Sequence, residues 1–185
     1  YVSANLDGFV NLLEACRHKI EEVRHVENDD GPKTRFVLAS SNAPLGRQSP
    51  PADESKVPLP ISPYGASKLA AEGYCLAYHG SWNIGTMALR FANVYGPFSG
   101  HKTSVVAKFF KDIYTTGQVT IDGDGRQTRD FIFVSDLCRA VVAALESDVG
   151  GELFQIATGR ETSIRELATL IGEAVGRPTE MQYGP

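Results

Sequence analysis

The sequence has 185 residues, 42% of them hydrophobic and 22% charged, which is ordinary for a soluble globular protein with one sizeable core. Its formal net charge of −4 argues against a nucleic acid or an anionic membrane as partner, and no apolar run is long enough to span a bilayer. The three cysteines are far apart, which favours free thiols in a reducing cytoplasm over a disulfide framework or a metal site.

Helix and strand patterns alternate along the first half of the chain. Apolar residues recur at helical spacing over 5–19, and a short buried-type strand is expected over 34–40. Residues 42–60 are rich in proline, serine and charge, which is typical of a surface loop that carries specificity. A helix is expected over 62–79 and a further strand over 84–91.

The second half continues this alternation. Ser135 or Asp136 is expected to cap its middle helix, and Thr162, Ser163 and Glu166 form a capping box before its last helix. The pattern predicts an α/β fold with a mainly parallel sheet. The expected helices lie at 104–114, 135–145 and 162–175, and the expected strands at 119–121, 130–134, 153–156 and 181–183.

The start of the helix at 62–79 holds a candidate acid/base pair. Ser62 is a good N-cap, and Pro63 suits the first helical position because its missing N–H costs nothing there. Tyr64 and Lys68 then project from one face of the first two turns. The ammonium and the positive end of the helix dipole both favour the phenolate, so Tyr64 is a candidate general acid/base. Taken alone, a tyrosine and a lysine at this spacing are more often a solvated surface pair. The motifs that accompany them in the sequence therefore decide whether a catalytic role is expected.

Three further motifs accompany this pair in a fixed order. A short apolar strand ends in Ala39–Ser41, the letters SPYGASK surround Tyr64, ALRFANVYGP covers 88–97, and GDGRQTRDFIFVSD covers 123–136. With all four in this order, the chain resembles the extended short-chain dehydrogenase/reductase family of NAD-dependent nucleotide-sugar epimerases and dehydratases. The resemblance runs over essentially the whole chain, and we expect the reaction of the UDP-glucose 4-epimerase type.

The resemblance implies the later part of a Rossmann-like, doubly wound parallel sheet with a small interrupted substrate-binding lobe. Residues 1–95 and 130–150 would form the dinucleotide-binding part, and residues 96–129 and 151–185 the lobe. It also implies that the family's N-terminal glycine-rich turn and its C-terminal end have no counterpart here. A truncated chain that catalyses nothing alone therefore stays open as an alternative function.

The resemblance also assigns the chemistry. Ser41 would hydrogen-bond the sugar hydroxyl or keto oxygen, Tyr64 would take the proton from the sugar 4-hydroxyl, and Lys68 would bind the nicotinamide ribose and assist Tyr64. A hydride would pass from carbon 4 to NAD, giving a 4-keto intermediate. These three residues would thus serve both catalysis and cofactor binding, and Ser40 and Ala92 would complete the contacts to NAD.

Substrate contacts follow in the same way. Asn42 and Asn93 would lie near the substrate, and Arg129 would pair with a phosphate, which suits a bidentate guanidinium. In the family, dehydratases carry an Asp-Glu pair directly after the catalytic hydroxyl. Asn42 and Ala43 stand there in this chain. Neither can ionise as a carboxylate, which favours 4-epimerisation and leaves a dehydratase or reductase as the alternative.

Two departures bear on the substrate, and one expectation concerns assembly. Leu45 stands where the family commonly has a tyrosine, and Asp122 stands where an aromatic residue often stacks on the nucleotide base, so the uridine assignment stays open. Family members often dimerise through two helices that correspond to 5–19 and 62–79, and their apolar faces predict a homodimer here.

Overall fold

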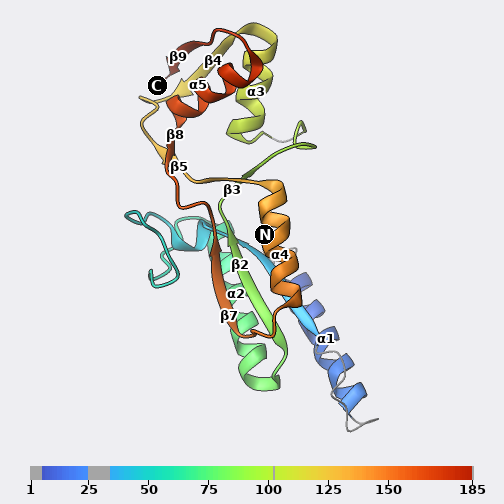
Figure 1. Ribbon diagram of the computed structural model, residues 1–185. Coiled ribbons are helices and arrows are strands. Elements are labelled where there is room, and N and C mark those ends of the chain that lie inside the picture. Colours follow the sequence, from blue (N-terminus) through green and yellow to red (C-terminus); the bar gives the residue numbers. More distant parts are fainter. Residues whose placement is uncertain (1–5, 25–33, 102, 185) are drawn as a thin grey trace. The chain divides into compact units, whose positions relative to one another are not determined.

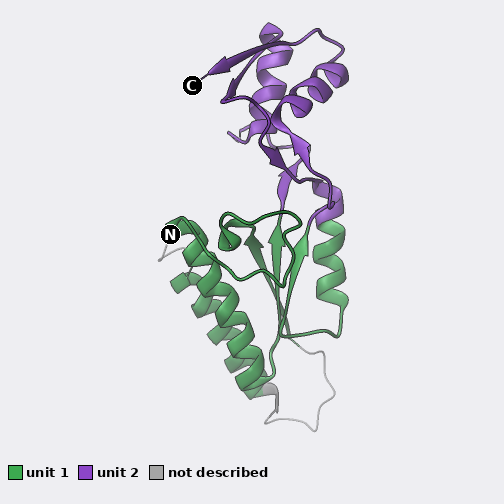
Figure 2. Ribbon diagram, turned by 90° about the vertical axis from the view of Figure 1, so that its left-hand side faces the viewer, with its two compact units in different colours: residues 1–91, 138–156 green, residues 92–137, 157–185 purple. Residues whose placement is uncertain are grey.

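The computed structural model describes residues 6–24, 34–101 and 103–184 (Figure 1). Two compact units are formed from interleaved stretches of the chain (Figure 2). Unit 1 comprises residues 1–91 and 138–156, and unit 2 comprises residues 92–137 and 157–185. Their boundaries differ by a few residues from those expected for the dinucleotide-binding part and the lobe, and the roles assigned to those two parts stay predictions.

Unit 1 is built on a parallel sheet of three strands in the order β1-β2-β7. β1 is Arg35–Ser41, β2 is Gly85–Phe91 and β7 is Glu152–Ile156. Five consecutive residues of β2 are buried, as expected for a central parallel strand that is covered on both faces. The polar ends of β1 and β2 therefore lie at one edge of the sheet, because parallel strands run in the same direction.

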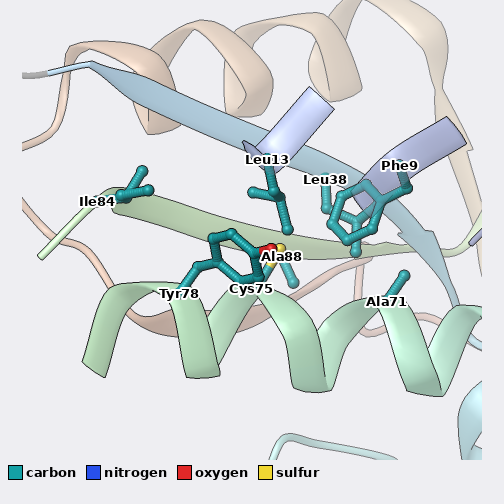
Figure 3. Packing of buried hydrophobic residues seen from close by; sticks show 8 residues of the cluster. All are labelled: Phe9, Leu13, Leu38, Ala71, Cys75, Tyr78, Ile84 and Ala88. Carbon is teal, nitrogen blue, oxygen red and sulfur yellow. The ribbon is translucent and has the colours of Figure 1, made fainter. Parts of the chain in front are cut away.

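Helices cover both faces of this sheet. α1 (Gly8–Arg24) and α2 (Pro63–Trp82) pack on one face, where Leu13, Leu38 and Cys75 belong to a single buried cluster (Figure 3). On the other face, Ala144 of α4 (Val134–Glu146) packs against the strand side chains. This two-sided cover confirms the expected Rossmann-like, doubly wound arrangement.

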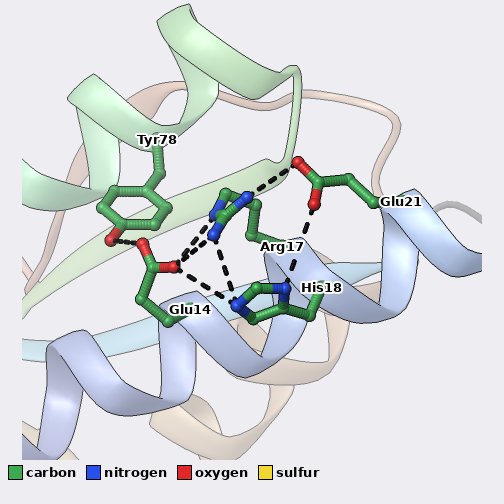
Figure 4. Close-up of polar contacts among 5 residues, drawn as sticks. All are labelled: Glu14, Arg17, His18, Glu21 and Tyr78. Carbon is green, nitrogen blue, oxygen red and sulfur yellow. Dashed lines mark hydrogen bonds and ion pairs between the residues drawn. The ribbon is translucent and has the colours of Figure 1, made fainter.

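Polar contacts join α1 to α2 at the rim of the buried cluster (Figure 4). The Tyr78 hydroxyl donates a hydrogen bond to Glu14, whose carboxylate also accepts from Arg17 at 2.8 Å. Arg17 in turn pairs with Glu21, again at 2.8 Å. These contacts fix the rotation of α1 against α2, so that Phe9 and Leu13 face the sheet.

The described part of unit 2 has three short strand pairs, the helices α3 and α5 and the first turn of α4. Its core lies between the helices and the β4–β9 pair, where Phe109, Ile113, Val119, Ile121 and Ala168 are buried. The β3–β6 and β4–β9 pairs are parallel, and β5–β8 is antiparallel. The elements are β3 (Asn93–Tyr95), α3 (Val105–Thr116), β4 (Gln118–Asp122), β5 (Thr128–Arg129), β6 (Phe131–Phe133), β8 (Thr162–Ser163), α5 (Ile164–Val175) and β9 (Glu180–Gly184).

The observed element bounds correct several expectations. Asn5, where the first helix was expected to start, lies outside the described residues, and α1 continues past Lys19 to Arg24. Helix α4 already begins at Val134, so Ser135 and Asp136 lie in its first turn and do not cap it. The strands β3, β5 and β8 were not expected, since two or three residues carry no readable period.

Candidate active site

The last residue of β1, Ser41, lies beside a short turn of helix. The Ser41 Oγ accepts a hydrogen bond from the Ala43 backbone N–H at 3.2 Å, and η2, a 3₁₀ turn, spans Ala43–Leu45. This turn lies within the stretch that was expected to be a loop. It bends the chain away from the sheet directly after Ser41, which leaves the hydroxyl at the end of the strand and half-buried.

The start of α2 has the local chemistry that the sequence predicts. Ser62 Oγ accepts from the Gly65 backbone N–H at 3.0 Å, and Pro63 is the first helical residue. Gly65 also allows a close approach, because a Cβ placed there would lie 2.5 Å from the Ala43 carbonyl oxygen. The first turn of α2, which carries Tyr64, is thus packed directly against the turn that follows Ser41.

Lys68 lies one turn further along and ties α2 to β1. Its Nζ donates a hydrogen bond to the Ala39 carbonyl oxygen at 3.0 Å and lies 5.9 Å from the centre of the Tyr64 ring. Burial lowers the pKa of Lys68, and the nearby Glu72 carboxylate opposes this shift. The structure therefore gathers the strand end with Ser41 and the first two turns of α2 with Tyr64 and Lys68 within unit 1.

A buried polar network lies directly behind these residues and was not anticipated from the sequence. Ser40 Oγ donates to Glu72 Oε1 at 2.5 Å, and Arg90 donates from Nε to Oε1 at 2.9 Å and from its terminal nitrogen to Oε2 at 2.7 Å. The available signal in the sequence was Arg90 itself, because a charged residue within an otherwise apolar strand needs a buried partner. The Ser40 hydroxyl donates its hydrogen bond to Glu72 in this network, and the expected contact of Ser40 with a cofactor stays a prediction.

Asn42 is held against β7. Its Oδ1 accepts a hydrogen bond from Gln155 Nε2, while Gln155 Oε1 is buried without a hydrogen-bond partner among the described residues. The Gln155 backbone N–H donates to the Glu54 carboxylate at 2.6 Å, which links the loop before α2 to the same strand. The amide of Asn42 therefore lies at the edge where β1 ends, and its expected contact with the substrate stays a prediction.

The other expected substrate and cofactor residues belong to unit 2. Ala92 is buried directly after β2. The Asn93 backbone N–H and Nδ2 both donate to the Asp130 carbonyl oxygen at 3.0 Å, which pairs β3 with β6. Arg129 is exposed and donates to the Thr128 carbonyl oxygen at 2.8 Å, and within the described ranges it forms no ion pair with Asp124 or Asp130.

Unit 2 also contains a large apolar cavity of about 1020 Å³. It lies between the loop after β3, the helices α3 and α5, and strand β6. Neither Asn93 nor Arg129 lines it. The lining includes Tyr95, Phe98, Phe110, Phe133, Arg160 and Leu170.

Two further features concern the same described ranges. No three His, Cys, Asp or Glu side chains there are grouped so as to hold a metal ion. None of the helices in these ranges combines the length and the apolar character that crossing a membrane requires.

Comparisons with known proteins agree with this geometry. Residues 1–157 match the NAD dependent epimerase/dehydratase family. A UDP-glucose 4-epimerase of Mycolicibacterium smegmatis is 37% identical over 99% of this chain and 56% of its own length. A dTDP-glucose 4,6-dehydratase of an Actinoplanes strain is 32% identical over 96% of this chain and 52% of its own length.

A solved structure superposes on the whole fold. The UDP-glucuronic acid 4-epimerase of Bacillus cereus, in complex with UDP-glucuronic acid and NAD, matches with a TM-score of 0.82 and 31% identity. That match covers 99% of this chain and 55% of the other. The chain thus spans about half the length of the relatives that it matches.

Proposed function

The chain belongs to the NAD dependent epimerase/dehydratase family, and on that premise we propose that the protein catalyses epimerisation at carbon 4 of a nucleoside-diphosphate hexose of the UDP-glucose/UDP-galactose type. The observation that carries this proposal is the gathering of Ser41, Tyr64 and Lys68. The ammonium of Lys68 is hydrogen-bonded to the strand that ends in Ser41 and lies within 5.9 Å of the Tyr64 ring centre.

The residues beside this pair fit a nicotinamide cofactor. Tyr64 and Lys68 lie one helical turn apart on the same face of α2, so a flat ring can lie against both. The Lys68 ammonium would hold the ribose next to that ring, and Ala92 would face it from the end of β2. NAD, when bound, would supply the acceptor and donor of the hydride at carbon 4.

The chain's own groups then move and hold the proton. Tyr64 takes the proton of the sugar 4-hydroxyl as carbon 4 is oxidised, and returns it when the hydroxyl is restored with inverted configuration. The positive charge of Lys68 favours the ionised phenol during this transfer. The Ser41 hydroxyl hydrogen-bonds the sugar oxygen at carbon 4 and fixes it within reach of Tyr64.

The positions after Ser41 favour epimerisation over dehydration. Loss of water needs an acid and a base at carbons 5 and 6, and neither Asn42 nor Ala43 has an ionisable side chain. The Asn42 amide is also hydrogen-bonded to Gln155 and oriented by it. Dehydratases do occur among the relatives, so dehydratase or reductase activity is the alternative that a product assay must test.

We assign contacts with the substrate's diphosphate to Asn93 and Arg129, while the identity of the base stays open. Asn93 is rigidly held by Asp130, and the exposed Arg129 guanidinium offers bidentate recognition of a phosphate. We expect the protein to act in the cytoplasm, because Cys16, Cys75 and Cys138 are all free thiols.

The proposal includes a homodimer through α1 and α2. The face of α2 that points away from the sheet presents small side chains in a continuous row, and Tyr74 and Leu76 lie exposed beside it. Such a row allows another helix to approach closely. Its members are Ala66, Ala70, Gly73, Ala77 and Gly80.

The test of the function is a matched pair of tyrosine variants. Tyr64→Phe should lower the turnover of UDP-glucose to UDP-galactose by about 10²-fold or more, the usual scale for loss of a general acid/base. Tyr74→Phe removes a hydroxyl from the same helix and should leave turnover unchanged. Wild-type turnover in Tyr64→Phe would remove Tyr64 from the mechanism. A wild-type protein that binds UDP-glucose but forms neither an epimer nor a dehydrated product would support the inactive alternative.

A further inference from the structure

The buried network of Ser40, Glu72 and Arg90 joins three elements at the edge where the candidate active site lies. The three residues are 4%, 2% and 2% exposed and come from β1, α2 and β2 respectively. Glu72 Oε1 accepts from both Ser40 and Arg90, and Oε2 accepts from Arg90 alone. The planar guanidinium and the planar carboxylate meet in two parallel bonds, which leaves little rotational freedom.

Stability alone is a weak reason for such a network. Apolar residues of similar volume often replace a buried ion pair with no loss of stability, because taking two charges out of water is costly. A fixed geometry is what the charged version adds. Each member of this network adjoins a residue of the candidate site: Ser40 precedes Ser41, Glu72 lies one helical turn after Lys68, and Arg90 is two residues before Ala92.

We infer that Ser40, Glu72 and Arg90 are positioning residues, which fix the depth of α2 along β1 and so hold Tyr64 and Lys68 at a set distance from Ser41. The catalytic consequence of this inference rests on the proposed function. Its structural part concerns Lys68 alone and is measurable without any substrate.

The groups around Lys68 explain why its titration is sensitive to the network of Ser40, Glu72 and Arg90. Its Nζ faces the Ala39 carbonyl on β1, and Tyr64 and Glu72 flank it on α2. Arg90 on β2 holds the same Glu72 carboxylate. Burial lowers the pKa of Lys68, while the negative charge of Glu72 raises it. Loss of that charge should therefore move the Lys68 titration to lower pH.

The first measurement is the pH titration of Lys68, monitored by NMR in protein that is isotope-labelled at the lysine Cε. The Lys68 signal is assigned by its absence in Lys68→Arg. In Glu72→Gln the midpoint should move to lower pH, because the negative charge that raises the pKa of Lys68 is lost. In Ser40→Ala, which keeps the ion pair, the Lys68 Cε signal should move from its wild-type position because β1 loses its hydrogen bond to Glu72 on α2. Glu21→Gln removes another carboxylate that pairs with an arginine in unit 1 and should leave Lys68 unchanged (Figure 4).

The second measurement is turnover in Ser40→Ala. We expect kcat to fall about tenfold with KM within twofold, since misplacement of a catalytic group by about 1 Å can cost up to about 10²-fold. Ser40→Thr keeps the hydroxyl and should recover most of the loss.

The two measurements separate failure of the network from failure of the function. Unchanged Lys68 signals in a folded Ser40→Ala protein would overturn the inference, whether or not Glu72→Gln folds. Wild-type kcat in Ser40→Ala would also overturn it. An inactive wild-type protein with the expected Lys68 shifts would instead reject the proposed function and support the network.

Discussion

At the residue scale, Gly65 controls how closely the turn after Ser41 approaches α2. A Cβ at this position would lie 2.5 Å from the Ala43 carbonyl oxygen. That oxygen belongs to the backbone, so it can move only if the whole turn moves. Gly65→Ala should therefore displace η2 and lower both the free energy of unfolding, by about 1–3 kcal/mol, and the turnover. Urea unfolding and an epimerase assay check this.

Gly100→Ala is the matched control for that substitution. No atom lies within 4 Å of a Cβ placed on Gly100, so the change should stay within about 0.5 kcal/mol, as for most surface sites. If both glycine variants have the same urea midpoint as the wild type, the close packing of η2 on α2 does not contribute to the free energy of unfolding.

The sequence was informative about residues with a local signature and silent about those paired across the fold. Tyr64 and Lys68 were found because their spacing on one helix is visible in the sequence. Glu72 continues that spacing, yet its partners Ser40 and Arg90 lie on two strands and meet it only once the sheet has formed. The buried network could not be predicted for this reason.

At the element scale, α2 shows how local chemistry fixes one helix end better than the other. Its start was predicted because Ser62 and Pro63 are strong N-terminal signals, and the Ser62 side chain does cap the helix. Its end was expected at His79 but lies at Trp82, because the left-handed cap is Asn83 and no glycine stands at that position. Tertiary packing of Tyr78 also extends the helix beyond its apolar period.

The buried face of α2 predicts a loss of stability in alkali. Burial, with help from the Glu72 charge, raises the pKa of the Cys75 thiol from 9.0 to about 12. Burial and the bond to Glu14 raise the pKa of Tyr78 from 10.0 to about 12. Between pH 9 and 12 the folded chain therefore holds protons that the unfolded chain has released. The contribution of these two groups to the free energy of unfolding is fully present below pH 9 and is lost as the pH rises toward 12.

Urea unfolding at several pH values measures this effect. The free energy of unfolding should fall above pH 9, and Cys75 should contribute up to about 1.4 kcal/mol per pH unit. Cys75→Ala should flatten the slope between pH 9 and 10, whereas Cys138→Ala, at an exposed thiol, should not. An equal slope in wild type and Cys75→Ala would contradict the raised pKa of Cys75.

At the scale of the whole molecule, one question is whether this chain holds NAD. We expect calorimetry to detect binding that Lys68→Met weakens about tenfold, because the hydrogen bond of an ammonium to the ribose is worth about 1.5–3 kcal/mol. Lys56→Met, in the loop of the same unit, should have no effect. Calorimetry is preferable to the fluorescence of Trp82, which ends α2 about 27 Å along the helix from Tyr64.

The control ligand for this experiment is AMP, which lacks the nicotinamide ribose. Its binding should not depend on Lys68. Equal NAD affinity in wild type and Lys68→Met would contradict the assigned contact. No binding of NAD to the wild-type chain would mean that the residues gathered around Tyr64 do not hold the cofactor by themselves.

The second question at this scale is assembly, since the outer face of α2 is apolar and built from small side chains. No atom lies within 4 Å of a Cβ placed on Gly73, so the monomer has room there for any side chain. If two copies pack through α1 and α2, Gly73→Arg would place a charged side chain between them. We expect light scattering at micromolar concentration to show a dimer for wild type and a monomer for Gly73→Arg.

Leu170→Arg is the control for that substitution, because Leu170 is also exposed but lies on α5 in unit 2. It introduces the same charge and should leave the dimer intact. A wild-type monomer, or a dimer that survives Gly73→Arg, would exclude the face of α2 as the contact. Loss of the dimer in both variants would point to a general effect of added charge. Loss in Gly73→Arg alone would assign the row of small side chains to the interface, because the two variants add the same charge at different surfaces.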